Sequence, residues 1–150
     1  MKHKKILFVC TGNTCRSPMA EAVLKAELKK RNIKWYTVQS AGLNAVEGAP
    51  VSEGAALVLK EAKIPFSPKF KSRKLTEKMV HGAYAVVCMT HAQQMEIKWY
   101  RNVTSFYELC GREIPDPYGG NADVYRATLR MIQANMDSII RGLDIREQGE

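Results

Sequence analysis

Long apolar runs are missing from this chain of 150 residues. A helix that crosses a membrane needs about 20 consecutive apolar residues, whereas the apolar segment after the basic N-terminus covers only residues 6–10. That segment is also too short for the apolar region of a secretory signal peptide. We therefore expect a cytoplasmic protein without a membrane partner.

Patterns of metal-ligating side chains are missing as well. The chain has four cysteines and three histidines, and their spacings match no zinc site. The cysteines are Cys10, Cys15, Cys88 and Cys110. In a reducing compartment they are expected to remain thiols, and Cys88, inside an apolar run, is expected to be a core residue. The sequence thus predicts neither a metal nor a cofactor.

Acidic residues are comparatively few. The chain has 23 Lys and Arg against 15 Asp and Glu, which gives a net charge of +8. The basic residues are spread along the chain, with one dense cluster at residues 69–74, and no known nucleic-acid-binding motif accompanies them. We expect attraction to phosphorylated or acidic proteins and no nucleic-acid partner. The cluster either lines the approach to a binding site or forms a solvated surface loop.

What the chain does contain is the composition and patterning of one globular domain over residues 1–150. Apolar, β-prone runs alternate with amphipathic segments, which predicts parallel strands joined by right-handed helical crossovers. Strands are expected at residues 4–9, 35–41, 83–89 and 103–106. Helices are expected at residues 17–31, 52–63, 75–81 and 91–100, and from 121 or 123 onward. This order predicts an α/β fold: a three-layer, doubly wound, four-stranded parallel sheet with helices on both faces.

Residues 6–18 place a polar loop between a buried strand and a helix. The apolar run ends at Cys10, and Pro18 suits the first turn of the helix, where its missing N–H costs nothing. Backbone N–H groups in such a loop form an anion-binding nest, to which the helix N-terminus adds unpaired donors. Gly12 and Asn13 best tolerate the left-handed backbone angles that a nest needs. The loop is therefore expected to hold a tetrahedral oxyanion, above all phosphate.

Two familiar nucleotide-binding motifs do not fit this loop. A nucleotide phosphate loop ends in Gly-Lys-Ser or Gly-Lys-Thr, whereas this loop ends in Cys15, Arg16 and Ser17. A dinucleotide fingerprint needs several glycines, and this loop has a single one. Its distinguishing groups are instead a thiol at the first position and a guanidinium at the seventh.

The thiol and the guanidinium together indicate nucleophilic chemistry on phosphorus. Cys10 lies where loop N–H groups and the helix terminus stabilise a thiolate, and Ser17 can add a hydroxyl hydrogen bond to the sulfur. Arg16 offers planar, two-pronged donation to two phosphate oxygens. The simpler alternative is a buried structural cysteine followed by an ordinary turn. The specific combination Cys-x5-Arg-Ser between strand and helix favours attack of Cys10 on a bound phosphoryl group.

A second candidate catalytic group stands between two prolines near the C-terminus. Asp116 is flanked by Pro115 and Pro117, which hold it extended and so aim one carboxyl group. Such an acid can protonate a leaving group and then activate water. Taken alone, an Asp-Pro turn in a loop explains the same residues.

The run Val-Cys-Thr-Gly-Asn-Thr-Cys-Arg-Ser-Pro-Met-Ala-Glu, residues 9–21, resembles the active-site loop of the low-molecular-weight protein tyrosine phosphatases. The resemblance continues at residues 40–42, Ser-Ala-Gly, and at residues 116–120, Asp-Pro-Tyr-Gly-Gly. Length and element order match too, so the resemblance covers essentially the whole chain and implies a single phosphatase domain with that family's fold. It implies a phosphocysteine intermediate on Cys10, with Arg16 binding phosphate and Asp116 acting as acid and then base.

The resemblance also implies supporting roles and partners. Ser40 would hydrogen-bond Asn13 and hold the phosphate loop in shape, and Cys15 would trap an oxidised Cys10 as a reversible disulfide. The substrate-binding residues would be Thr11, Gly12, Asn13, Thr14, Cys15, Ser17 and Tyr118. The partners would be phosphorylated proteins, and the chain would be a monomer or a weak homo-oligomer.

The phosphate loop is more polar than in most tyrosine phosphatases of this group, where aliphatic residues usually replace Thr11 and Thr14. In this respect it resembles the family's protein arginine phosphatases, in which a threonine at the position of Thr14 selects phosphoarginine. A polar rim disfavours an aromatic ring and tolerates a guanidinium, which favours phosphoarginine, with phosphotyrosine as the alternative. Tyr118 would serve either substrate.

Two other classes are less consistent with the sequence. Thioredoxin-linked arsenate reductases share the fold and a similar loop, but they need two cysteines seven apart near the third strand. Here Cys88 is followed seven residues later by Met95. A non-catalytic phosphoprotein-binding module would keep Arg16 without needing both Cys10 and Asp116.

Overall fold

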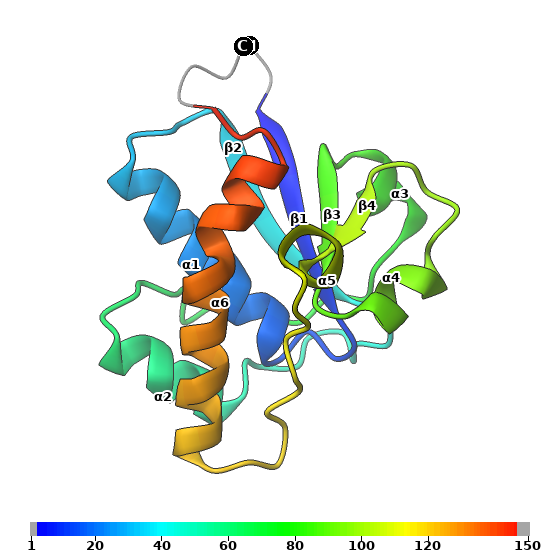
Figure 1. The fold of residues 1–150 in the computed structure, drawn as a ribbon. Helices are drawn as coiled ribbons and strands as arrows, with labels where there is room; N and C mark the ends of the chain where they lie inside the picture. Colours follow the sequence, from blue (N-terminus) through cyan, green and yellow to red (C-terminus); the bar gives the residue numbers. More distant parts are fainter. Residues whose placement is uncertain (1–2, 147–150) are drawn as a thin grey trace.

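A computed structural model describes residues 3–146. Within these residues the strands are β1 (Lys4–Cys10), β2 (Tyr36–Gly42), β3 (Ala85–Cys88) and β4 (Val103–Ser105). The helices are α1 (Arg16–Lys30), α2 (Glu53–Glu61), α3 (Glu77–His81), α4 (His91–Glu96), α5 (Phe106–Cys110) and α6 (Ala122–Gly142). Figure 1 shows how these elements are arranged around the sheet.

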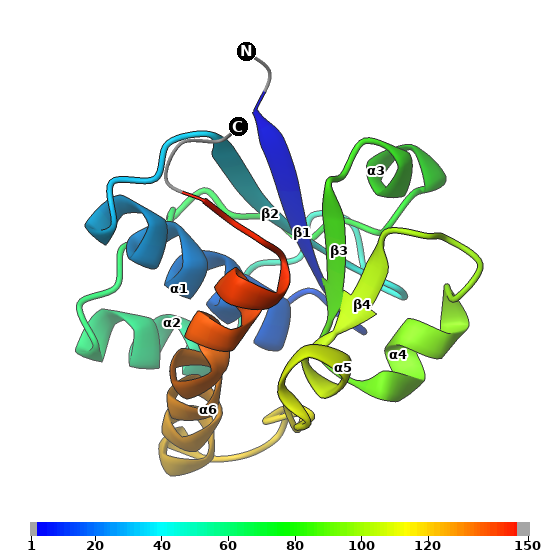
Figure 2. The ribbon, with the colours of Figure 1, turned by 45° about the horizontal axis from the view of Figure 1, so that its top comes forward.

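The predicted three-layer sheet is confirmed. The four strands are parallel and follow the order β2-β1-β3-β4. Helices α1, α2, α5 and α6 pack on one face, and α3 and the end of α4 cover the other (Figure 1 and Figure 2). In β1, Cys10 is paired with Gly42 of β2. Because ligands of such sheets bind beyond the carboxyl ends of the strands, this register places Cys10 at the edge where a site is expected.

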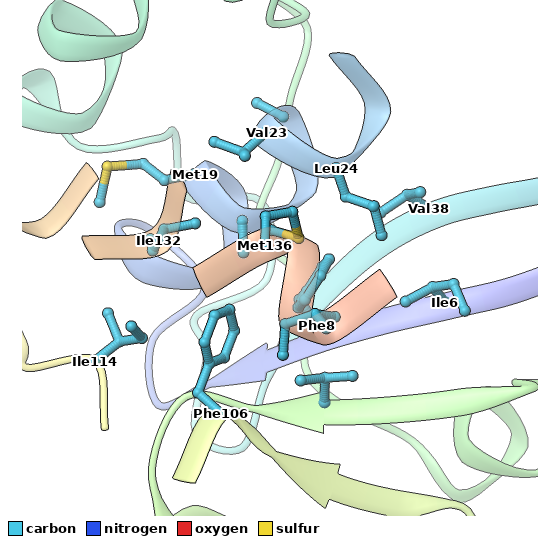
Figure 3. Close-up of a cluster of buried hydrophobic side chains, with 14 of the residues drawn as sticks. Ile6, Phe8, Met19, Val23, Leu24, Val38, Phe106, Ile114, Ile132 and Met136 are labelled. Atoms are coloured by element: carbon cyan, nitrogen blue, oxygen red, sulfur yellow. The ribbon is translucent and has the colours of Figure 1, made fainter. Parts of the chain in front are cut away.

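The strand β1 is buried on both faces, which explains its uninterrupted apolar run. Ile6 and Phe8 belong to the cluster beneath α1 and α6, whereas Leu7 and Val9 belong to the cluster beneath α3. In Figure 3, Phe8 lies among side chains of the first cluster, near the ring of Phe106, at a centroid distance of 6.2 Å. Successive residues of a strand point to opposite faces, so one short segment holds both helical layers in place.

Helix α6 buries one apolar stripe, which its sequence predicts from apolar residues spaced three and four apart. The buried positions include Tyr125, Leu129, Ile132, Met136 and Ile139. Asn121 caps its N-terminus by accepting a hydrogen bond from Val124 N–H. The polar sequence of residues 144–150 predicts a frayed tail; Ile145, however, is buried in the core, and residues 147–150 lie outside the described part of the chain.

The element boundaries differ from prediction mainly after β3. Helix α4 ends at Glu96, earlier than the predicted residue 100, and β3 begins at Ala85 rather than residue 83. The sequence predicts a strand over residues 103–106 and irregular chain from residue 108, whereas Phe106–Cys110 form helix α5. Ser105 explains this, because its side chain accepts a hydrogen bond from Glu108 N–H and so caps a new helix directly after β4.

Candidate active site

The loop of residues 11–15 joins the end of β1 to the start of α1. Asn13 has φ of 56°, in the left-handed region, as predicted. Gly12 does not, and a Cβ built there would meet only Thr14 Oγ1, at 3.7 Å. Of the two residues predicted to tolerate a left-handed angle, Asn13 adopts one and Gly12 does not. Helix α1 has no side-chain cap at Cys15 and no acidic residue in its first turn, so its N-terminus favours an anion.

The Cys10 sulfur is surrounded by hydrogen-bond donors. Asn13 N–H donates to Cys10 Sγ at 3.3 Å, and Ser17 Oγ lies 2.9 Å from the same sulfur. Ser17 Oγ also accepts a hydrogen bond from Asn13 Nδ2 at 2.9 Å. The single proton of the Ser17 hydroxyl faces two acceptors, the Cys10 sulfur at 2.9 Å and Ala41 O at 3.5 Å, and the shorter contact favours the sulfur. An N–H group and a hydroxyl group therefore both lie within hydrogen-bonding distance of the sulfur.

The end of β2 supports the backbone of the loop from one side. Leu43 N–H donates to Cys10 O, and Asn44 N–H donates to Thr11 O, each at 2.9 Å. At Gly42, an added Cβ would lie 2.7 Å from Thr11 O and 2.9 Å from Asn13 N. The close approach of these two backbones therefore requires glycine at position 42.

Ser40 has a partner other than the predicted one. Its hydroxyl donates to Glu21 Oε1 at 2.6 Å, and Glu21 Oε2 accepts from Lys25 Nζ at 2.7 Å. The expected Ser40–Asn13 contact is thus replaced by a bond from β2 to α1. Ser40 is fully buried, and Glu21 nearly so. Buried polar groups need partners, and these two satisfy each other below the loop.

Asn13 is instead held by the basic segment of residues 69–74. Arg73 N–H donates to Asn13 Oδ1 at 2.9 Å, and Ser72 Oγ donates to Asn13 O at 2.7 Å. Ser72 is buried, with an exposed fraction of 1%. The cluster therefore supports the phosphate loop, a role that neither sequence interpretation included. A serine among lysines, about 60 positions from its partner, gives no local signal of this contact.

Arg16 is fixed at the start of α1. Its guanidinium is almost fully buried, and its Nη1 donates to Ile114 O at 3.0 Å. Its Nη2 lies 3.7 Å from Asp116 Oδ2. The segment before the last helix thus brings a carbonyl and a carboxylate to the same guanidinium, and it places Asp116 above the loop.

Asp116 lies in a turn that it helps to form. Its Oδ1 accepts a hydrogen bond from Tyr118 N–H at 3.1 Å, while its side chain is 53% exposed. Tyr118 is 78% exposed and packs little against the rest of the protein. One carboxylate oxygen is therefore anchored, and the exposed carboxyl group remains accessible to a bound molecule.

A cavity of about 200 Å³ brings most of the predicted residues together. Its lining residues are Cys10, Thr11, Gly12, Thr14, Cys15, Arg16, Asp116 and Tyr118. Asn13 and Ser17 are fully buried and contact the sulfur, while Ser40 contacts α1. The structure thus separates the predicted set into a cavity lining and a supporting layer.

Gln93 of α4 is a supporting residue that the sequence analysis missed. Its Nε2 donates to Thr11 Oγ1 at 3.2 Å, and its Oε1 accepts from the backbone N–H groups of Met89 and Thr90. It also completes a capping box with Thr90. The capping pattern Thr-x-x-Gln was visible in the sequence, but the contact with Thr11, 82 positions away, was not.

Cys15 faces two hydroxyl groups. Its Sγ donates to Ser52 Oγ at 3.3 Å and lies 3.3 Å from Tyr125 Oη. Burial, together with the Cys15 contact, raises the pKa of Tyr125, so this hydroxyl stays protonated. Cys10 and Cys15 are both free thiols lining one cavity. Formation of a disulfide between them remains a prediction.

Within the described residues, neither a metal-binding cluster nor a membrane-spanning helix is present. Among residues 3–146, no cluster of three or more His, Cys, Asp or Glu side chains is arranged to hold a metal ion. None of the helices in the described part of the chain combines the length and apolar character that a membrane crossing requires.

The family model for "Low molecular weight phosphotyrosine protein phosphatase" matches residues 5–148. This chain belongs to the low-molecular-weight protein tyrosine phosphatase family. A protein-arginine-phosphatase of Geobacillus stearothermophilus is 34% identical over 93% of this chain and 95% of its own. The low-molecular-weight protein-tyrosine-phosphatase Ptp of Acinetobacter johnsonii is 34% identical over 89% of this chain and 93% of its own.

Solved structures of relatives have the same fold. The YwlE arginine phosphatase from Geobacillus stearothermophilus has a TM-score of 0.81 at 34% identity, covering 94% of this chain and 93% of its own. A cysteine-to-serine mutant of YwlE arginine phosphatase, with a phosphorylated active-site serine, has a TM-score of 0.85 at 31% identity. That match covers 97% of this chain and 99% of the mutant's. The family resemblance and the fold predicted from the sequence are both confirmed.

In this phosphatase the cysteines are expected to differ sharply in reactivity. Cys88 is fully buried, and burial raises its pKa to about 12, whereas Cys10 lines the cavity among hydrogen-bond donors. Iodoacetate should therefore alkylate Cys10 first and leave Cys88 unmodified while the protein is folded. Timed peptide mass spectrometry, with and without inorganic phosphate as a protecting anion, measures this. Equal labelling of both residues in the folded protein would contradict the assignment of the reactive thiol.

Proposed function

We propose that this phosphatase removes phosphoryl groups from phosphoarginine residues of proteins through a phosphocysteine intermediate. The observation that carries the proposal is the shared cavity, in which the Cys10 thiol, the Arg16 guanidinium and the Asp116 carboxyl group converge. A nucleophile, an electrophilic clamp and an acid around one small space are the groups that phosphoryl transfer needs.

In the first step, Cys10 Sγ forms a bond to phosphorus as the bond from phosphorus to the leaving nitrogen breaks. The carbonyl oxygen of Ile114 accepts a hydrogen bond from one of the five guanidinium N–H groups of Arg16. The other four N–H groups are available to two phosphoryl oxygens. Loop N–H groups and the N-terminus of α1 stabilise the remaining charge. Asp116, in its protonated form, gives its proton to the departing guanidine.

In the second step, Asp116 acts as a base. Its carboxylate takes a proton from water, the water oxygen bonds to phosphorus, and the bond between sulfur and phosphorus breaks. Inorganic phosphate leaves, and Cys10 returns as a thiolate that Ser17 and Asn13 stabilise. The trapped phosphoserine of the YwlE mutant supports an equivalent covalent intermediate here.

The preference for phosphoarginine rests on the polar rim of the cavity. Thr11 and Thr14 both line it, and Thr11 Oγ1, which accepts one hydrogen bond from Gln93, keeps a second lone pair that can accept a guanidinium N–H. Hydroxyl groups at the rim suit a polar guanidinium better than a phenyl ring. Relatives named as protein-arginine-phosphatases support the same preference.

Phosphotyrosine is the second candidate, and Tyr118 favours it. This exposed side chain lines the cavity beside Asp116, where it can pack against an aromatic ring of the substrate. Relatives with equal identity are named as protein-tyrosine-phosphatases.

The two candidates are separated by measuring kcat/KM for a phosphoarginine peptide and a phosphotyrosine peptide of the same sequence. We expect kcat/KM for the phosphoarginine peptide to be higher by at least about tenfold, which corresponds to about 1.4 kcal/mol in transition-state binding. Thr14→Ile should reduce or reverse this ratio, because it replaces a hydroxyl by a larger apolar group. Preference for phosphotyrosine in the unmodified protein would show that the polar-rim argument is wrong.

We further propose that residues 1–150 act in the cytoplasm as one phosphatase domain, either as a monomer or as a weak homo-oligomer. The net charge of +8 supports phosphorylated proteins as substrates. No metal or other cofactor enters the two steps above, and no nucleic-acid partner is proposed.

A further inference from the structure

A second cavity, of about 720 Å³, lies between α1 and residues 65–73. It is larger than the active-site cavity and shares no lining residue with it. Its volume lies within the range of about 300–1,000 Å³ that is usual for sites of small organic ligands. The catalytic steps proposed above do not use it.

The walls of this cavity combine aromatic rings with small side chains. Phe66 and Phe70 form one wall, with their ring centroids 5.2 Å apart and their planes inclined at 41°. Ala22 and Ala26 of α1 also line the cavity and leave room for a flat group. Both phenylalanines are only partly buried. An aromatic ring bound in this cavity would cover apolar surface and would pack against the faces and edges of the two phenylalanine rings.

The remaining lining is strongly basic. Lys25, Lys29, Lys71 and Arg73 line the cavity, and Glu21 is the one acidic group among its lining residues. The carboxylate of Glu21 is already engaged by Ser40 and Lys25. An anion therefore meets an excess of positive charge, at the edge of an apolar surface that attracts a ring.

Two lining residues connect this cavity to the phosphate loop. Arg73 donates its backbone N–H to Asn13 Oδ1 and its Nη2 to Ser40 O, at 3.2 Å. Glu21 accepts the Ser40 hydroxyl. A ligand that fixes residues 65–73 also fixes the support of Asn13, which donates to Cys10 Sγ.

From this arrangement we propose that the cavity is a regulatory site for a small aromatic anion, a ring bearing a carboxylate or a similar acid. Its occupation tightens the binding of phosphate by the loop, because the anion holds the segment that shapes Asn13. The binding test does not depend on which phosphoamino acid is the substrate, so its failure and that of the proposed function are distinguishable.

The probe is naphthoate, titrated into the full chain by calorimetry and by amide nitrogen–proton correlation spectra. We expect shifts centred on residues 65–73, and binding at least about tenfold tighter than that of naphthylmethanol, its neutral analogue. Tighter binding of decanoate would indicate an acyl-chain site and overturn the aromatic assignment. Shifts centred on residues 10–17 would place naphthoate in the active site and overturn the proposal.

Two kinds of variant locate the site. The double variant Lys25→Gln with Lys71→Gln should weaken naphthoate binding at least about tenfold, while Lys60→Gln with Lys98→Gln, an equal change of charge on exposed residues elsewhere, should not. Ala26→Phe fills the cavity and should also abolish binding. If both double variants weakened naphthoate binding equally, net charge alone would explain the effect, and the proposed location of the site would be wrong.

The regulatory part is tested by the dissociation constant of inorganic phosphate with and without saturating naphthoate. We expect phosphate to bind at least about threefold more tightly with naphthoate, and naphthoate to gain the same factor with phosphate, as linkage requires. Competition between them would mean that both occupy the active site. An unchanged phosphate affinity would overturn the coupling.

Discussion

Cys10→Ser is expected to lower kcat/KM for the preferred phosphopeptide by at least about 10³-fold, equivalent to about 4 kcal/mol of transition-state stabilisation. A serine hydroxyl is a much weaker nucleophile than a thiolate, and the cavity holds no base beside it except the exposed Asp116. The variant should still fold and bind phosphate, because a serine oxygen at position 10 can keep the contacts with the Ser17 hydroxyl and the Asn13 backbone N–H.

Stopped assays of phosphate release and intact-mass spectrometry check this prediction together. The serine variant should accumulate one phosphoryl group on the protein. A phosphoserine forms slowly, but it is also hydrolysed slowly, because the serine oxygen is a poor leaving group. Cys110→Ser is the matched control, because that thiol is half-buried near Asn135 and away from the cavity. Retained turnover in the Cys10 variant, or an equal loss in the control, would contradict a phosphocysteine mechanism.

The part of the site that the sequence predicted well is the part encoded by neighbouring residues. Residues 6–18 hold a strand, a loop and the beginning of a helix, and this order alone places Cys10, Arg16 and Ser17 in and beside one loop. Asp116 was predictable for a similar reason, because its two flanking prolines restrict the backbone locally. The parallel sheet followed from the alternation of apolar runs and amphipathic segments.

The supporting layer could not be predicted, because its contacts join distant segments. Ser72 and Arg73 reach Asn13 across about 60 positions, and Gln93 reaches Thr11 across 82. These are ordinary polar residues whose partners are decided by packing of whole elements. In the sequence, the same residues fit equally well on a solvated loop or at a helix cap.

Two errors in the prediction have the same physical origin. Residue type favours a left-handed angle at both Gly12 and Asn13, but of the two only Asn13 adopts one, and glycine is sterically required instead at Gly42, where two backbones meet. Ser40 was paired with Asn13, but a buried carboxylate, Glu21, is nearby and needs a donor. Steric and hydrogen-bonding demands that arise from packing overrode preferences of single residues.

Asp116→Asn tests the second catalytic group, and its effect should depend on the leaving group. The leaving groups of phosphoarginine and of phenyl phosphate depart poorly unless they receive a proton, so kcat for these substrates should fall by about 10²–10⁴-fold. Para-nitrophenyl phosphate has a stable leaving group and should lose far less. The asparagine keeps an oxygen for Tyr118 N–H and nearly the same shape, so the turn should persist.

The same substitution separates catalysis from binding. Asparagine is neutral, like the protonated acid that the first step needs, so KM should stay constant, or fall where the carboxylate 3.7 Å from the Arg16 guanidinium would otherwise be ionised and repel the dianionic substrate. Asp123→Asn is the matched control, since that carboxylate is exposed and paired with Arg126. If Asp116→Asn slowed all substrates by one common factor, or raised KM while sparing kcat, Asp116 would be a structural or binding residue. A loss graded by leaving-group basicity, with KM unchanged, requires proton transfer from this position.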